Sequence, residues 1–185
     1  MVIPQRAIVR PRVFGPEGTV ALPVEEVVAE LLYRGGDRPI QIMGGPGSGK
    51  TTASRHLAAT LFPVSRLVFL DDTTEAKFKE SGYRVILASR KPVERDCDVL
   101  RLAPWTDDDL IEYLLATCPS RCGSVMQRLR DSTDKALIQG NPAVWRLTLD
   151  ALAADAELPD IRAAIDRWLP VMFRNPEERR LAGLW

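Results

Sequence analysis

The chain has 185 residues, 45% of them apolar and 27% charged, which is an ordinary composition for a soluble globular protein. Its formal net charge is zero, so it lacks the basic surplus that general nucleic-acid binders use to neutralise phosphates. No apolar run approaches the roughly 20 residues that span a bilayer, and residues 1–5 lack the pattern of a signal peptide. The three cysteines indicate free thiols, and we expect a cytoplasmic protein without a membrane partner.

The start of the chain is rich in proline and glycine. Residues 1–23 therefore predict an extended lead-in rather than a core element. Residues 24–32 then repeat apolar side chains at helical spacing, and Gly35 and Gly36 end the predicted helix. We assign residues 1–35 to this lead-in and first helix.

A pattern of strands separated by helices follows in residues 36–103. Continuous apolar runs predict strands buried on both faces, and apolar residues at helical spacing predict the helices between them. The predicted strands are residues 40–43, 67–70, 84–88 and 98–102, and the predicted helices are residues 51–61 and 74–80. This alternation indicates an α/β fold built on a compact parallel sheet of about four strands.

The rest of the chain carries helical patterns without a strand signal. Thr106 and Asp109 have a spacing close to that of a capping box, and Asn141-Pro142 predicts the start of another helix. We expect a helical, lid-like subdomain over residues 104–172, and a tail or linker to a further region over residues 173–185.

The segment after the first predicted strand carries the clearest chemical signal. It reads Gly-Gly-Pro-Gly-Ser-Gly-Lys-Thr and fits the phosphate-loop pattern G-x-x-x-x-G-K-[ST] completely. The glycines allow backbone N–H groups to line a phosphate, and the following helix adds its positive end. We expect Lys50 to reach the β- and γ-phosphates and the Thr51 hydroxyl to coordinate Mg²⁺. The predicted nucleotide-binding residues are Gly44, Gly45, Pro46, Gly47, Ser48, Gly49, Lys50, Thr51 and Thr52.

Acidic residues follow the second strand of the predicted core. Asp71 would lie at the carboxyl end of that strand, where α/β sheets bind ligands, and can serve as a second Mg²⁺ ligand. Asp72 can share this task, and Glu75 can polarise an attacking water. The alternative is that Asp71 and Asp72 cap the next helix.

The third predicted core strand ends in Ser89 and Arg90. If this strand lies beside the one that precedes the phosphate loop, both side chains emerge near the γ-phosphate. A guanidinium at that point can sense whether the phosphate is present. The alternative is an exposed arginine in a loop that leads to Pro92.

The order of these motifs resembles the STAND class of P-loop ATPases, and its NACHT-like members most. The resemblance covers residues 36–155 and implies an adenine contact for Pro142, in the sequence Gly140-Asn141-Pro142. It also implies that Asp71 and Glu75 are the two acids of the Walker B segment. Only residues 52–66 separate the phosphate loop from that strand, where the family usually has another strand and helix. Either the core is trimmed, or Asp71 is not the Mg²⁺ ligand.

Three functions are compatible with these patterns. The first is a switch that binds ATP or ADP with Mg²⁺, acts as a slow ATPase at most, and has a protein partner or self-associates. The second is a small-molecule or nucleoside kinase, for which Arg121, Arg128 and Arg130 could contact substrate. The third is a non-hydrolysing scaffold stabilised by nucleotide. A GTPase is disfavoured because no Asn-Lys-x-Asp motif is present, and the lone His56 has no evident partner for general-base work.

Overall fold

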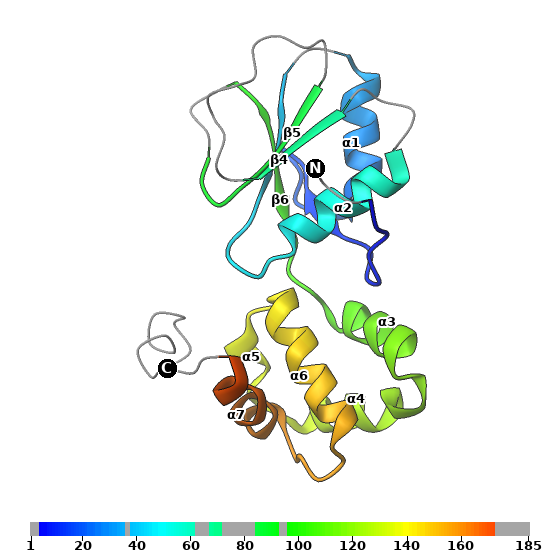
Figure 1. Ribbon diagram of the computed structural model, residues 1–185, viewed down its shortest axis with the longest axis vertical. Helices are drawn as coiled ribbons and strands as arrows, with labels where there is room; N and C mark the ends of the chain where they lie inside the picture. Colours follow the sequence, from blue (N-terminus) through cyan, green and yellow to red (C-terminus); the bar gives the residue numbers. More distant parts are fainter. Residues whose placement is uncertain (1–3, 36–37, 62–66, 72–83, 93–95, 173–185) are drawn as a thin grey trace. The chain divides into compact units, whose positions relative to one another are not determined.

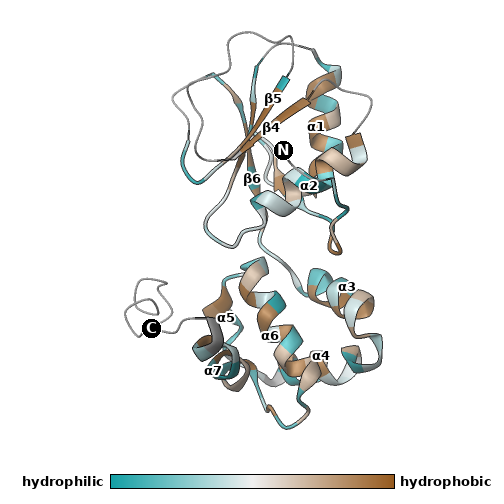
Figure 2. Ribbon diagram, viewed as in Figure 1, coloured by the Kyte–Doolittle hydropathy of each residue, from teal (hydrophilic) through white to brown (hydrophobic). Residues whose placement is uncertain are grey.

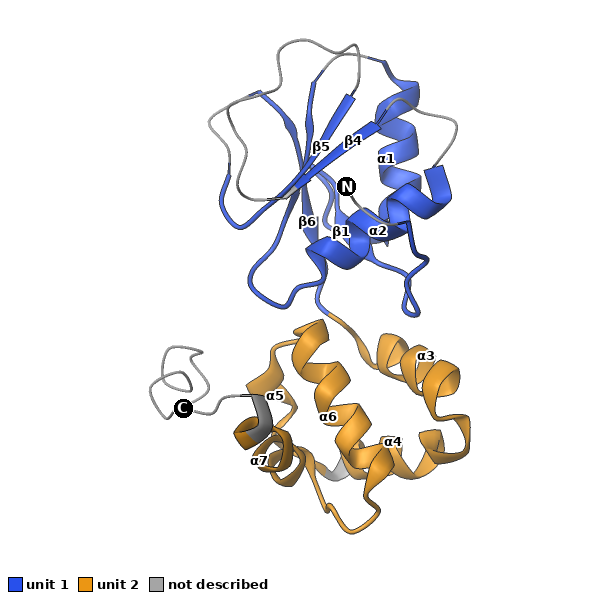
Figure 3. Cartoon of the chain, in the orientation of Figure 1, with its two compact units in different colours: residues 1–104 blue, residues 105–185 orange. Residues whose placement is uncertain are grey.

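The computed structural model describes residues 4–35, 38–61, 67–71, 84–92 and 96–172 (Figure 1). The chain divides into two compact units, Met1–Pro104 and Trp105–Trp185 (Figure 3). Unit 1 contains the sheet, and every element described in unit 2 is helical. Together they make an α/β protein.

Unit 1 is built on a mixed sheet with the strand order β2-β1-β6-β3-β5-β4. Neighbours β6, β3, β5 and β4 are parallel, whereas β1 runs antiparallel to both β2 and β6. The expectation of a wholly parallel sheet of four strands is therefore wrong, although its four strands are all present. The strands are β1 (Arg12–Phe14), β2 (Ala21–Pro23), β3 (Ile40–Met43), β4 (Leu67–Asp71), β5 (Arg84–Ser89) and β6 (Asp98–Leu102).

The proline-rich start of the chain belongs to this sheet. β1 and β2 form an antiparallel pair, and β1 also pairs with β6, which places Val13 opposite Leu102. Val13 is fully buried in the core of unit 1. The prediction of a lead-in outside the core is wrong. Pro11 directly precedes β1 and Pro23 ends β2, so both prolines lie at strand ends, where a missing N–H is tolerated.

Two helices cover one face of the sheet (Figure 1). They are α1 (Val24–Tyr33) and α2 (Lys50–Leu61), and they pack against each other. Figure 2 shows strands β4 and β5 as mostly hydrophobic. The fully buried side chains of this core include Val28, Ile40, Ile42, Leu57, Ile86 and Leu100. The helix predicted over residues 74–80 lies outside the described residues.

Unit 2 has its own apolar core. The helices are α3 (Asp107–Thr117), a 3₁₀ turn η1 (Pro119–Arg121), α4 (Cys122–Asp131), α5 (Lys135–Ile138), α6 (Pro142–Ala154) and α7 (Ile161–Met172). Their buried faces bring together Leu114, Leu129, Leu149, Leu152 and Ile161. The predicted capping box is present at α3, where Asp109 accepts hydrogen bonds from the backbone N–H and the hydroxyl of Thr106. Within the described part of the chain, no helix is both long and apolar enough to cross a membrane.

Candidate functional site

The glycine loop, residues 44–49, joins the end of β3 to the start of α2. Gly47 and Gly49 have φ values of 73° and 92°, a region in which side chains other than glycine are strained. At Gly44 the limit is space, because an added Cβ would lie 2.4 Å from Ser48 Oγ. Glycine is therefore favoured at positions 44, 47 and 49 by the local structure, and loop conformations of this kind form concave surfaces lined by N–H groups.

The start of α2 adds positive potential to the glycine loop. The first N–H groups of an α-helix point out of its start toward whatever lies before it, and at α2 the Ala53 N–H already donates to the Gly49 carbonyl of the loop at 2.8 Å. The first turns of α1 and α3 carry acidic side chains, but the first turn of α2 has none. The positive end of this helix is therefore not offset by a carboxylate of its own first turn.

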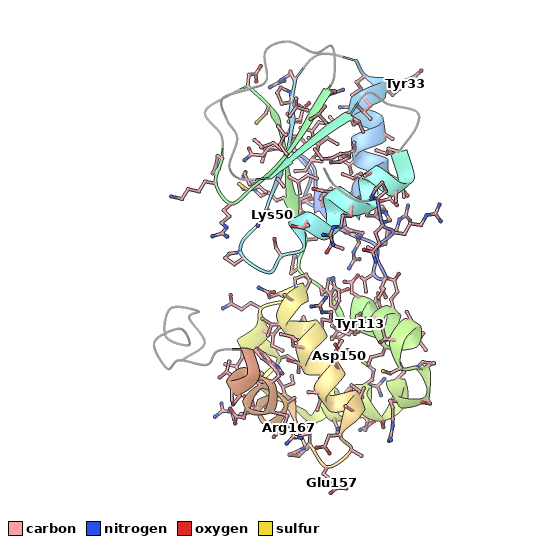
Figure 4. The ribbon with its side chains drawn as sticks, in the orientation of Figure 1. Tyr33, Lys50, Tyr113, Asp150, Glu157 and Arg167 are labelled. Atoms are coloured by element: carbon pink, nitrogen blue, oxygen red, sulfur yellow. The ribbon has the colours of Figure 1, made fainter. Side chains whose placement is uncertain are left out.

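The Lys50 side chain folds back over the glycine loop (Figure 4). Its Nζ donates to the carbonyl oxygens of Gly44 at 2.8 Å and Gly45 at 2.9 Å. The Lys50 ammonium is thus held at the loop by two neutral carbonyl oxygens. A negatively charged oxygen would bind the ammonium more strongly and could replace them. Thr51 and Thr52 are both exposed on the first turn of α2.

β5 brings its polar end to the glycine loop. It pairs with β3 so that Ser89 lies opposite Met43, and the Gly44 N–H donates to the Ser89 carbonyl at 3.2 Å. Arg90 is the next residue and is exposed. The sequence predicted that Ser89 and Arg90 would emerge beside the loop if their strand lay next to the strand that precedes it. β5 is a direct neighbour of β3, so this condition is met.

The predicted acids are placed only in part. Asp71 ends β4 opposite Ala88 of β5, and Ala88 in turn lies opposite Ile42 of β3. Two interstrand spacings put the Asp71 backbone about 10 Å from β3, at the same edge of the sheet. Its side chain, Asp72 and Glu75 lie outside what the structure describes. Among the described residues, no group of three or more His, Cys, Asp or Glu side chains could hold a metal ion.

Pro142 belongs to unit 2, at the first position of α6. The Asn141 side chain caps this helix by accepting from the N–H groups of Ala143 at 3.0 Å and Val144 at 3.4 Å. Proline costs no hydrogen bond in this first turn. The expected helix start is confirmed, and the adenine contact stays a prediction, since each unit is described by itself.

A buried glutamine beside the glycine loop was not predicted. Gln41 is fully buried within β3, and its Nε2 donates to Ser89 Oγ and, at 2.7 Å, to the Lys91 carbonyl. Ser89 Oγ donates to the same carbonyl at 2.8 Å. A polar residue interrupting the apolar run Ile-Gln-Ile-Met was the available signal, because a buried amide needs partners.

Neither the family models nor the curated proteins with which the sequence was compared gave a match. The chemistry of the site must therefore be argued from its own geometry.

His56 has structural partners on α2. Its Nδ1 accepts from the Ala7 N–H at 3.2 Å, and its Nε2 lies 3.3 Å from Glu25 Oε2. Burial acts to raise the pKa of Glu25, but its own backbone N–H, the Arg10 guanidinium and the nearby His56 ring outweigh burial and hold that pKa below its usual value. His56 therefore ties the start of the chain to α1 and α2.

Of the three arginines considered for substrate contact, Arg128 is bonded to the backbone of unit 2. Arg128 donates to the carbonyls of Leu152 at 2.6 Å, Asp155 at 3.1 Å and Leu158 at 2.8 Å, which closes the end of α6. Its charge is therefore engaged in the fold, while Arg121 and Arg130 are exposed.

The described site can bind an anion. It combines a lysine ammonium, a glycine loop with two positive-φ positions, a helix N-terminus without acidic residues, and an adjacent exposed arginine. Each component favours negatively charged oxygens, and all four lie at the carboxyl edge of parallel strands, where α/β sheets take up ligands.

Proposed function

We propose that this chain is a P-loop nucleoside triphosphatase of the STAND class, most similar to NACHT-like ATPases, and acts as a nucleotide-dependent switch. The observation that carries the proposal is the position of Lys50. Its ammonium is held over the glycine loop at the start of α2, and the Ser89–Arg90 end of β5 lies directly beside it. This is where the phosphates of ATP would meet Lys50 and Arg90.

The phosphates would take over contacts that the loop now makes with itself. Phosphate oxygens would replace the Gly44 and Gly45 carbonyls at Lys50 Nζ, and backbone N–H groups of the first turn of α2 would bind the same anion. Thr51 would supply a hydroxyl to Mg²⁺, with Asp71 as the proposed acidic ligand. Arg90 would contact the γ-phosphate, which ADP lacks.

The strand order supports assigning Asp71 to the same site. β5 separates β4 from β3, and all three strands are parallel, so Ser89 and Asp71 end at one edge of the sheet. A carboxylate about 10 Å from the loop strand is within reach of a hydrated Mg²⁺ ion. This arrangement favours a trimmed core over a different identity for β4.

A kinase is the less favoured alternative. It needs arginines free to contact a second substrate, and Arg128 is engaged by backbone carbonyls. A non-hydrolysing scaffold would bind nucleotide in the same way and differs only in turnover.

Calorimetric titration with ATP, ADP and GTP, each with Mg²⁺, tests the proposal, followed by a phosphate-release assay. We expect adenine-selective binding with slow release. Lys50→Ala should weaken ATP binding by about 10- to 100-fold, since charged hydrogen bonds contribute about 1.5–3 kcal/mol.

Lys135→Ala is the matched control, because Lys135 pairs with Asp107 in unit 2. It should bind ATP as the unaltered chain does. Absence of nucleotide binding by a folded chain, or full binding by Lys50→Ala, would refute the proposal. Binding without any phosphate release would favour the scaffold.

A further inference from the structure

A hydrogen-bonded cluster lies under the turn that carries Arg90. Its centre is Gln41, whose side chain donates to Ser89 Oγ and to the Lys91 carbonyl. These two acceptors flank Arg90 in the sequence. The Gln41 amide therefore holds the turn from both sides, while the exposed Arg90 stands between its two points of attachment.

Further contacts keep the Gln41 amide in this orientation. The Cys97 thiol, which lies at the start of the segment leading into β6, is 3.6 Å from Gln41 Oε1 and can donate to it. Burial, followed by the nearby charges of Asp98 and Asp96, raises the pKa of this thiol. Cys97 therefore keeps its proton and remains a donor, which leaves the Gln41 Nε2 group to face Ser89 and Lys91.

The cluster also fixes the turn relative to the glycine loop. Gln41 lies on β3, only three positions before Gly44, and the Gly44 N–H itself bonds the Ser89 carbonyl. The same strand thus holds the glycine loop at its end and the Arg90 turn through its side chain. The Gln41 side chain itself contacts the turn at Ser89 and Lys91, on either side of Arg90.

We infer that Gln41 is a positioning residue which holds the Arg90 guanidinium beside the glycine loop and thereby sets how strongly the chain prefers a nucleoside triphosphate over a diphosphate. This inference rests on the proposed function. Lys50 contacts phosphates that both nucleotides share, so its loss lowers both affinities. Gln41 acts only through Arg90, so its loss lowers the affinity for ATP relative to ADP.

The test measures the ATP and ADP dissociation constants, with Mg²⁺, for the full chain carrying Gln41→Met, Arg90→Ala or both. Methionine keeps the length of the side chain and removes its amide. Gln41→Met should reduce the ratio of ATP to ADP affinity by about 5- to 10-fold, as Arg90→Ala does, with no further loss in the double variant, because residues acting as one unit are not additive.

Thr148→Val is the control for loss of a buried hydrogen bond, since Thr148 is fully buried in unit 2 and bonds Trp168 Nε1 at 3.4 Å. It should leave the ratio unchanged. If Gln41→Met does not fold, Ser89→Ala replaces it, because it removes one of the two attachments and should shift the ratio in the same direction.

The outcomes separate the inference from the proposed function. An unaltered chain that binds neither nucleotide refutes both. Suppose instead that the unaltered chain prefers ATP. The inference alone is then refuted if Gln41→Met keeps this preference, or if it lowers the affinities for ATP and ADP by an equal factor. Additive effects of Gln41→Met and Arg90→Ala would refute it as well, since they would show that Gln41 does not act through Arg90.

Discussion

Two buried polar side chains of unit 1, Gln41 and His56, connect segments that lie far apart in the sequence. Gln41 holds the turn at the end of β5, and His56 joins the backbone of Ala7 to the carboxylate of Glu25. Leaving such groups without partners costs about 1–3 kcal/mol each, so each network fixes one local arrangement.

The charge of Glu25 should stabilise the fold above the pH at which an unfolded glutamate titrates. Its pKa in the folded chain lies below the ordinary value of 4.5, so the stabilisation is complete above that pH and is lost as the pH falls through the folded pKa. We expect Glu25→Gln to be less stable than the unaltered chain at pH 7. Denaturant unfolding at several pH values should show this gap closing below about pH 4.5.

Glu30→Gln is the matched control for this experiment. Glu30 lies on the same helix and pairs with Arg34, but both side chains are mostly exposed. Surface pairs of this kind contribute about 0–1 kcal/mol, so the control should stay close to the unaltered chain at every pH. A Glu25→Gln gap that is constant from pH 7 to pH 3 would contradict the assigned role.

At the scale of elements, helix ends are closed by specific side chains. Asn141 caps the start of α6, and Arg128 of α4 binds the carbonyls at its end and in the loop that follows. A helix leaves its last carbonyls without intrahelical partners, and a guanidinium satisfies several of them at once. Arg128 is thus a structural link between α4, α6 and the approach to α7.

Replacing Arg128 should destabilise unit 2. Arg128→Ala leaves the partly buried carbonyls of Leu152, Asp155 and Leu158 without this donor, and we expect a loss of about 2–3 kcal/mol in the free energy of unfolding. Thermal or denaturant unfolding measures it. Arg130→Ala, on the same helix but exposed, should change stability by less than about 0.5 kcal/mol. Equal effects of the two substitutions would contradict the link.

Local patterns predicted the elements that local interactions determine. The spans of β3 and β6 were predicted correctly, because short apolar runs bounded by turn residues mark buried strands. β1 was missed because its place depends on pairing with β6, far along the sequence, and its own three residues carry no strand pattern. Arg90 was predicted from the sequence as a candidate phosphate sensor. The role of Gln41 could not be predicted in the same way, because it depends on a contact between two strands, β3 and β5.

At the scale of the whole molecule, the chain consists of two units with separate cores. Buried residues of unit 1 gather between the sheet and α1 and α2, whereas those of unit 2 lie among α3, α4, α6 and α7. A unit with its own core can in principle fold alone. The helical unit is the simpler one to test, because its described contacts are mostly between neighbouring helices.

Residues 105–185 should fold as an isolated fragment. We expect a helical circular dichroism spectrum and a cooperative thermal transition, because Leu114, Leu149 and Leu152 are fully buried within this unit. In the fragment, Leu149→Ala should cost about 2–5 kcal/mol. Leu137→Ala, at a side chain that is 56% exposed, should cost far less. A fragment that is helical but melts without cooperativity would show that the core of unit 2 is incomplete by itself.

The strand order also constrains how the protein can assemble during synthesis. β3 lies between β5 and β6, and both of these strands follow it in the sequence. While a ribosome is still extending the chain, Ile40–Met43 therefore has no neighbour until Ser89 has emerged, and its second neighbour is complete only at Leu102. Until then, β3 leaves apolar side chains and backbone donors exposed. Such a strand can bind a chaperone or pair with another nascent chain. The glycine loop can reach its final shape only late in translation, after most of unit 1 has left the exit tunnel.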